Sequence, residues 1–290
     1  MDKKIIVRHR WSIHILMRYK SVLIGGTILL IYILLAIFGP LIVPQGPDEQ
    51  NLFSALQPPS RRHPLGTDEL GRDLLSRLIH GGRYSLLVTL ISAVLASLIG
   101  VPMGLIAGYK GGVLGNLIIR IIDFALTFPT LVLAIIVATI FGMGLRGLVF
   151  AIVASFFPPI ARLTYIVTLS ICQKDFVLAA QALGAGNLRI LMHHVFRNIA
   201  GPILVEISLR AGQAVLVATS LGFLGLGVSP PTPEWGTIMS RGMNFLFVAP
   251  HIVIATGMLI SLSILGFNLL ADGLRDMLDP RMRRLIWKLK

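Results

Sequence analysis

SLLVTLISAVLASLIGVPMGLIA, residues 85–107, contains no charged side chain. A helix of about 20 mainly apolar residues crosses a hydrocarbon core of about 30 Å, so this stretch predicts a membrane-spanning helix. Gly100, Gly104 and Gly108 follow one another at every fourth position. Because small residues at that spacing let helices approach closely, we expect a second helix to pack against this face.

Other apolar stretches of similar length lie on both sides of this one. The chain is 55% hydrophobic and 13% charged, whereas soluble domains carry about 45–50% apolar and about 25% charged residues. The sequence therefore predicts an all-α membrane protein with six transmembrane helices. The expected spans cover residues 22–43, 85–107, 117–141, 148–171, 203–228 and 248–270.

The basic residues indicate how the chain lies in the membrane. Lys and Arg number 26 against 13 Asp and Glu, which gives a formal net charge of +13. Most of the basic residues lie in the N-terminal segment, the loop 172–202 and the tail 273–290. The positive-inside rule then predicts both termini in the cytoplasm. Since the charges flank apolar runs, we expect the basic chain to meet the lipid bilayer and no nucleic acid.

Three regions follow from this arrangement. Residues 1–84 hold a cytoplasmic segment, the first span and an outer loop, and residues 85–272 hold the other spans with the cytoplasmic loop 172–202. Residues 273–290 form a cytoplasmic tail. The apolar stretch 22–43 is longer than the core of a signal peptide, about 7–15 residues, and no small-residue cleavage pattern follows it. We expect it to be an uncleaved anchor.

The loop 172–202 contains FVLAAQALGAG at 176–186 and NLRILMHHVFRN at 187–198. These segments indicate a short helix, a glycine break that permits a sharp turn, and a second helix. A surface of small residues suits docking into a groove on another protein. On this pattern alone, an amphipathic helix packed beneath the bundle is an equal alternative. The residues concerned are Ala179, Ala180, Ala182, Gly184, Ala185 and Gly186.

Four segments in order carry a resemblance that covers nearly the whole chain. Ala179-Ala180-x-x-x-Gly184 resembles the loop motif of ABC importer permeases, with Leu178 where the family often has Glu. HPLGTDELGRDLLSR at 63–77, LGLGVSPPTPEWG at 224–236 and DGLRDMLDPR at 272–281 resemble the dipeptide, oligopeptide and nickel group, in particular its second, C-type permease. One departure is Arg197, where the group often has Pro.

The resemblance implies a type I importer permease fold and a non-catalytic subunit that forms half of a pore. A homologous second permease would form the other half, two ATP-binding subunits would bind ATP and Mg, and an extracytoplasmic solute-binding protein would deliver cargo. The loop 172–202 would couple ATP hydrolysis to the pore in the cytoplasmic membrane of a prokaryote. Peptides are the expected cargo, with nickel or a metal chelate as the alternative.

Other functional classes are less well supported by the residues. The chain has no Gly-x-x-x-x-Gly-Lys-Ser/Thr phosphate loop, so we expect the ATPase on another polypeptide and no cofactor in this one. An ion-coupled secondary transporter would need no docking loop. An intramembrane protease would need a serine beside a base, and Ser220, Ser261 and His251 stand in no recognisable constellation.

Ionisable residues inside spans are costly and are functional candidates by default. Glu206 and Arg210 are four positions apart on the fifth expected span, so they share a face and can pair. They either line the pore or join helices structurally. Arg120 and Asp123 are three apart and predict a second, structural pair, while Arg162 follows the Pro158-Pro159 break.

The outer segments carry a further set of expectations. Asp68 is expected to cap an interfacial helix over 70–79, whose arginines point away from the membrane. A metal site on Thr67, Asp68 and Asp73 is the minor alternative. Trp235 is expected to anchor at the membrane interface or to contact the solute-binding protein. The glycines Gly222, Gly225 and Gly227 predict close packing or a break in the fifth helix.

Overall fold

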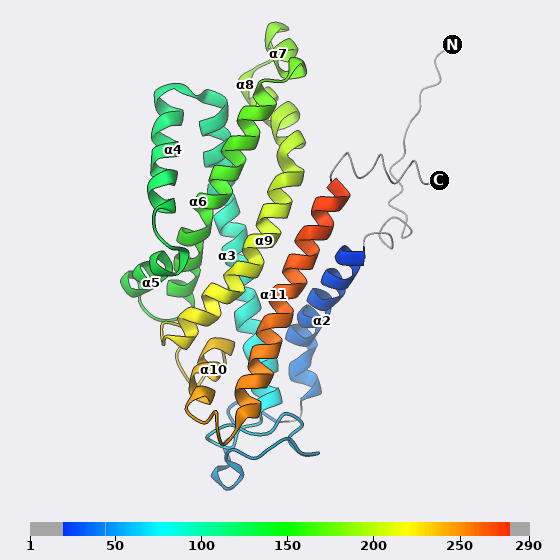
Figure 1. Cartoon of the computed structure of the whole chain (residues 1–290), viewed down its shortest axis with the longest axis vertical. Coiled ribbons are helices and arrows are strands. Elements are labelled where there is room, and N and C mark those ends of the chain that lie inside the picture. Colours follow the sequence, from blue (N-terminus) through cyan, green and yellow to red (C-terminus); the bar gives the residue numbers. More distant parts are fainter. Residues whose placement is uncertain (1–19, 44, 279–290) are drawn as a thin grey trace, which may run out of the picture.

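The computed structural model describes residues 20–43 and 45–278, and this part of the chain is an elongated helical bundle (Figure 1). Within the described residues there is no β-strand, only an isolated bridge between Thr67 and Asp73. The helices are α2 (Lys20–Ile42), η1 (Leu52–Ser54), α3 (Leu74–Lys110), α4 (Gly112–Leu126), α5 (Thr130–Phe141), α6 (Leu145–Cys172), α7 (Asp175–Ala182), α8 (Asn187–Arg189), the π-helix η2 (Ile190–Phe196), α9 (Arg197–Phe223), α10 (Trp235–Met243) and α11 (Pro250–Leu278).

The membrane spans agree with an all-α membrane fold but differ in one place from six straight helices. Five helical stretches are long and apolar enough to cross a bilayer, namely Lys20–Gly39, Leu74–Lys110, Leu145–Cys172, Asn187–Phe223 and Pro250–Leu278. A sixth candidate exists only if α4 and α5 count as one span, and these two helices are bent by 94°.

The span expected over 117–141 is therefore a bent pair of helices and not one continuous helix. The chain leaves helical geometry after Leu126, and Pro129 stands at the start of α5 with φ −54° and ψ 133°. Proline fixes its own φ and disfavours helical geometry in the residue before it, so the break falls there. The basic stretches of the N-terminal segment and the tail, 1–19 and 279–290, lie outside the described residues.

The predicted close packing on the glycine face is confirmed between α3 and α6. A Cβ added to Gly100 would lie 2.7 Å from the carbonyl oxygen of Phe157, and one on Gly108 would lie 2.8 Å from Cβ of Thr168. A Cβ on Gly104 would collide with the carbonyl of Ala161. Any larger side chain at these positions would push the two longest central helices apart.

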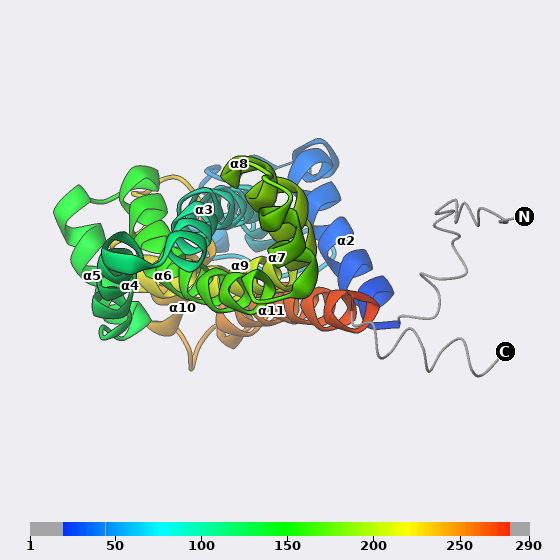
Figure 2. The ribbon, with the colours of Figure 1, turned by 90° about the horizontal axis from the view of Figure 1, so that it is seen from above.

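The first helix is attached to the last one. α2 and α11 lie side by side at one edge of the bundle (Figures 1 and 2). Gly25 has the backbone of Gly266 and Leu270 within 2.7 Å of where its Cβ would be, and the Tyr32 hydroxyl donates to the Leu259 carbonyl at 2.7 Å. Helices α4, α6 and α9 pack against α3, and α5 packs against α6, while α7 and α10 lie at opposite ends of the bundle (Figure 1). We call these the α7 end and the α10 end.

Candidate functional site

At the α7 end, the chain forms the expected helix, glycine turn and second helix. Gly184 has φ +78°, a conformation that residues with a side chain rarely adopt. The turn is closed by hydrogen bonds from Gly184 N to Gln181 O at 2.9 Å and from Ala185 N to Ala180 O at 3.0 Å. The second helix begins as α8, continues through the π-helix η2 and runs directly into α9.

Most of the residues singled out in this loop are exposed. Ala179, Ala182, Gly184 and Gly186 are exposed, while Ala180 and Ala185 are half-buried. The larger apolar side chains around them are also in contact with solvent, with exposed fractions of 51% for Leu178, 88% for Leu183 and 75% for Leu188. The loop thus presents an apolar surface that no described part of the chain covers.

The underside of the same loop is fixed to the bundle. Val177, Ile190 and Val195 are fully buried and share a core cluster with Leu105 of α3. The Tyr109 hydroxyl at the end of α3 donates to Oδ1 of Asn187 at 2.8 Å. The inner side of α7 is therefore packed against α3, and the second helix of the loop continues through η2 into α9.

One of the two predicted ion pairs at membrane depth is confirmed. The Arg210 guanidinium contacts Glu206 Oε1 through Nη2 at 2.6 Å and Nε at 2.7 Å. Its Nη1 donates to Oε1 of Gln213, which is exposed on the same helix, at 2.7 Å. Arg210 is partly exposed, so the pair is open on one side of α9.

The other prediction, a pair between Arg120 and Asp123, is wrong. Asp123 does not pair with Arg120 on its own helix but with Arg162 of α6, at 3.0 Å from Oδ1 to Nη1. Arg120 is exposed on α4. The bend after α4 and the contact of α4 with α6 bring Asp123 to a neighbour that lies 39 positions later in the sequence, which the three-residue spacing could not reveal.

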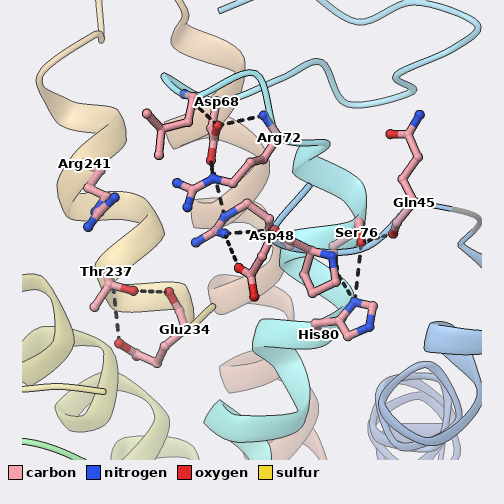
Figure 3. Close-up of polar contacts among 12 residues, drawn as sticks. Gln45, Asp48, Asp68, Arg72, Ser76, His80, Glu234, Thr237 and Arg241 are labelled. Carbon is pink, nitrogen blue, oxygen red and sulfur yellow. Dashed lines mark hydrogen bonds and ion pairs between the residues drawn. The ribbon is translucent and has the colours of Figure 1, made fainter. Parts of the chain in front are cut away.

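At the α10 end, a set of charged side chains is buried around Asp68 (Figure 3). Asp68, Arg72 and Arg77 are 3%, 2% and 4% exposed. Oδ2 of Asp68 lies 2.6 Å from Arg72 Nε and 3.3 Å from Arg77 Nε. Arg72 and Arg241 both contact Glu69 Oε1, at 3.2 and 3.1 Å. We call these five residues the arginine cluster.

The arginine cluster joins the loop 45–73 to α3 and α10, and a separate contact joins the loop to α11. Arg77 belongs to α3 and also donates to the carbonyl of Pro47 at 3.0 Å, while Arg241 belongs to α10. His251 of α11 has its Nε2 3.2 Å from the Thr67 carbonyl oxygen. Because opposite charges and backbone groups satisfy one another, this end of the molecule is closed by its own chain.

The interfacial helix expected over 70–79 is wrong. Helix α3 begins at Leu74 and continues to Lys110, and its N-cap is Asp73, whose side chain accepts from Ser76 N at 2.8 Å. Asp68 does accept backbone N–H bonds, from Leu70 and Arg72, but in the turn before the helix. The carboxylates of the metal alternative have other partners, since Asp68 pairs with two arginines and Oδ1 of Asp73 is hydrogen-bonded to Nδ1 of His63 at 2.9 Å.

Trp235 has neither of the two expected roles. It is 1% exposed, its Nε1 donates to the Leu78 carbonyl at 2.9 Å, and its ring meets that of Tyr32 edge to face at 5.9 Å. It is thus a core residue between α2, α3 and α10, and its indole N–H is satisfied in the interior. Gly82 of α3 packs directly on the indole.

Glu234, next to Trp235, is a buried carboxylate that sequence reasoning missed. It caps α10 by accepting from Gly236 N at 3.0 Å and Thr237 N at 3.3 Å. Burial raises the pKa of Glu234 from 4.5 to about 7, and the two backbone hydrogen bonds only partly oppose that rise.

The glycines at the end of α9 pack closely and mark the end of the helix. A Cβ on Gly222 would collide with the Glu234 carboxylate, and Gly225 has φ +81° just after α9 ends. Both expectations for these glycines, close packing and a helix break, are therefore confirmed.

The comparison with protein families decides what kind of protein this architecture belongs to. Residues 100–284 match the family described as the binding-protein-dependent transport system inner membrane component. The chain belongs to this family. Residues 11–59 also match the N-terminal transmembrane domain of oligopeptide transport permease C. As an inner membrane component of a binding-protein-dependent system, the chain is a multi-pass protein of a prokaryotic cytoplasmic membrane, as its resemblance implied.

Relatives of this inner membrane component cover most of its length. It is 43% identical over 270 residues to the di/tripeptide transport system permease protein DppC of Pseudomonas aeruginosa, covering 91% of this chain and 89% of that protein. It is 37% identical over 270 residues to the glutathione transport system permease protein GsiD of Pectobacterium atrosepticum, covering 92% and 89%.

A solved structure confirms the fold. A chain of the inward-facing MetNI methionine ABC transporter superposes with a TM-score of 0.59 at 16% identity, covering 70% of this chain and 96% of that one. The expected type I importer permease fold is therefore confirmed, while the low identity limits this comparison to the fold.

Proposed function

We propose that this chain forms half of the translocation pore of an ATP-driven importer of short peptides. The other half is a homologous second permease, two ATP-binding subunits that bind ATP and Mg dock on the α7 end and its counterpart, and a solute-binding protein delivers cargo from outside. The chain itself is non-catalytic. The positive-inside pattern supports placing both termini and the α7 end in the cytoplasm, and the α10 end outside.

The observation that carries this proposal is the two-sided character of the loop 172–202. Its exposed side is apolar at Leu178, Leu183 and Leu188, as a helix that inserts into a groove on a partner requires. Its inner side is packed on α3 and continuous with α9. A surface that only faced solvent would need no apolar residues, and a loop that only bound a partner would need no rigid attachment.

The pair Glu206–Arg210 supports the placement of the pore along α9. Arg210 and Gln213 are partly or fully exposed in a helix that meets the criteria for a membrane span. Charges exposed to lipid are strongly unfavourable, so we assign this side of α9 to the passage. The pair carries no net charge, which suits a zwitterionic peptide better than a bare cation.

Short peptides are the proposed cargo because the relatives named above are described as permeases for di- and tripeptides and for glutathione, itself a tripeptide. At 43% identity over nearly the whole chain, the peptide permease is the nearer of these two. Within the described residues, no group of three or more His, Cys, Asp or Glu side chains is arranged as a metal site.

Reconstitution tests the proposal. The chain, its second permease, both ATP-binding subunits and the binding protein are placed in liposomes, and uptake of a radiolabelled dipeptide is followed. We expect uptake only with ATP on the side of the α7 end and with the binding protein on the other side. Uptake that persists without the ATP-binding subunits would rule out an ATP-driven importer. Uptake of nickel or a nickel chelate, with no uptake of any di- or tripeptide, would contradict the proposed cargo.

A further inference from the structure

Helix α4 has a stripe of polar side chains on a predominantly apolar helix. Asn116, Arg120, Asp123 and Thr127, at its C-terminal end, follow one another at spacings of four, three and four, so they lie within about 60° of the helix circumference. All four are exposed. We call this set the α4 stripe.

A second exposed face of the same helix is entirely apolar. Val113, Leu117, Ile121 and Phe124 are 89%, 56%, 50% and 67% exposed, and they follow one another at spacings of four, four and three. The inner face is formed by Gly115 and Ile122. Two exposed faces of opposite character on one membrane helix indicate two different surroundings, of which the apolar face suits lipid.

The α4 stripe is extended onto α6 by the ion pair Asp123–Arg162. Asp123 is 49% and Arg162 40% exposed, and the Arg162 guanidinium lies 5.7 Å from the centre of the Tyr165 ring. Arg162 lies about 15 Å from the Cys172 end of α6 and about 26 Å from its Leu145 end, at a rise of about 1.5 Å per residue. The pair therefore lies well inside a membrane-spanning helix.

Lipid cannot cover such a pair without a large penalty, because hydrocarbon offers neither hydrogen bonds nor a high dielectric constant. The pair also retains too much exposed surface to be a buried structural link within this chain. Water, and whatever polar solute moves through it, is the environment that satisfies half-exposed charges of both signs.

We propose that the α4 stripe and Arg162 line the water-filled passage through which cargo crosses the membrane. This inference rests on the proposed function as a pore-forming permease. Neighbouring positive and negative groups then offer a partner to both the carboxylate and the ammonium group of a zwitterionic peptide. The passage is thereby extended from α9, where Glu206 and Arg210 lie, across α6 to α4.

Cysteine accessibility tests the proposal directly. Cys172 is the only cysteine of this chain, so Cys172→Ala removes every thiol from it, and labelling is read on this chain after the subunits are separated. Asn116→Cys and Thr127→Cys place a thiol on the α4 stripe without removing either partner of the ion pair. Leu117→Cys and Phe124→Cys are the matched controls on the apolar face of the same helix. All are expressed with the complete transporter in membrane vesicles of both orientations.

We expect a charged, water-soluble methanethiosulfonate reagent to modify the two stripe positions at least about tenfold faster than the two apolar positions. Equal rates at all four positions, or protection of Asn116→Cys and Thr127→Cys in both vesicle orientations, would show that the stripe is covered by protein or lipid and would overturn the proposal.

ATP-dependent dipeptide uptake in the Cys172→Ala background separates the two levels of inference. If uptake is absent but the labelling difference holds, the proposed function fails and the α4 stripe still lines an aqueous passage. If uptake is normal but the labelling difference is missing, only the assignment of the α4 stripe fails.

Discussion

The two ends of the molecule place their charged and apolar side chains in opposite ways. At the α10 end, the three central members of the arginine cluster, Asp68, Arg72 and Arg77, are buried, and each charge of the cluster faces another from the same chain. At the α7 end, apolar side chains such as Leu183 and Leu188 are 88% and 75% exposed. The α10 end also exposes apolar residues, including Phe53, but on loops that the cluster holds in place.

This difference bears on which end would need another protein to cover it. Buried charges are tolerated only when their partners are present, and at the α10 end the partners of Asp68 come from this chain. The exposed apolar surface at the α7 end fits the proposed docking of an ATP-binding subunit, which would cover it. Substitutions at the α10 end should therefore change stability, and those at the α7 end should change binding and transport.

The largest expected effect comes from Asp68→Asn. This change keeps the shape of the side chain but leaves the guanidinium groups of Arg72 and Arg77 buried without a full counter-charge. Removing one member of a buried ion pair destabilises proteins by about 3–5 kcal/mol. We expect a decrease of that size in the free energy of unfolding, measured with the purified protein in detergent micelles.

Asp48→Asn is the matched control. Asp48 also contacts Arg77, at 3.3 Å, but its side chain is 48% exposed. Exposed ion pairs contribute about 0–1 kcal/mol, so this variant should remain close to the wild type. Equal losses for the two variants would mean that burial of the cluster does not determine the stability of the α10 end.

Glu234→Gln should increase the free energy of unfolding, in contrast to Asp68→Asn, and the size of the increase should depend on pH. The folded protein binds the Glu234 proton more strongly than the unfolded chain does, because burial raises the pKa of Glu234 from 4.5 to about 7. Its contribution to stability is therefore fully present below pH 4.5 and is lost as the pH rises through about 7. Glutamine stays neutral, so we expect the stability of the variant relative to the wild type to rise by about 2–3 kcal/mol between pH 5 and pH 8.

The reason for this contrast with Asp68 lies in the surroundings of the two carboxylates. Asp68 has two arginines, whereas Glu234 is held by the backbone N–H groups of Gly236 and Thr237. Unfolding free energies of wild type and variant are compared from pH 5 to 8, with Glu49→Gln as an exposed glutamate control. Parallel curves for wild type and Glu234→Gln would contradict the prediction.

At the α7 end, Leu183→Asp should weaken docking while leaving the isolated chain intact. Burial of a leucine side chain contributes about 1.5–3 kcal/mol, so the dissociation constant for the ATP-binding subunit should rise about 10- to 100-fold. Leu52→Asp introduces the same change at the α10 end, at a side chain that is 70% exposed, and should not affect docking. A normal dissociation constant for Leu183→Asp would place the docking surface elsewhere.

The membrane fold could be predicted because each span is a local property of composition. A bilayer requires about 20 apolar residues in one stretch, and that requirement is visible without knowledge of the fold. The glycine face of α3 and the pair Glu206–Arg210 could also be predicted, because spacing alone determines which residues of one helix are neighbours. The loop with Gly184 was found because glycine marks a conformation that other residues avoid.

The errors arose where the answer depends on segments far apart in the sequence. Arg77 contacts the Pro47 carbonyl 30 positions away and Arg241 contacts Glu69 172 positions away, whereas only the pair Asp68–Arg72, four residues apart, could be inferred from spacing. Trp235 is amphipathic, and sequence alone does not show that Leu78 supplies the acceptor for its N–H. The partner of Asp123 could not be predicted for the same reason, since the bend at Pro129 directs α4 toward Arg162 of α6.

The smallest expected effect comes from a substitution in the turn of the α7 end. It should separate docking of the ATP-binding subunit from coupling of that subunit to transport. Gly184→Val places a β-branched residue at φ +78°, where it is strained by about 1–3 kcal/mol, and the turn should relax by breaking its hydrogen bond to Gln181. Gly186→Val is the matched control, because Gly186 has φ −65° and ψ 148°, which valine adopts readily, and both sites have open space around them. We expect uptake by Gly184→Val to fall at least about tenfold, equivalent to about 1.4 kcal/mol, with unchanged membrane insertion and a loss of unfolding free energy no larger than the strain at the turn. Gly186→Val should transport normally. If both variants transport at the wild-type rate, the turn at Gly184 is not needed for coupling, and the exposed leucines alone would distinguish the α7 end from the self-contained α10 end.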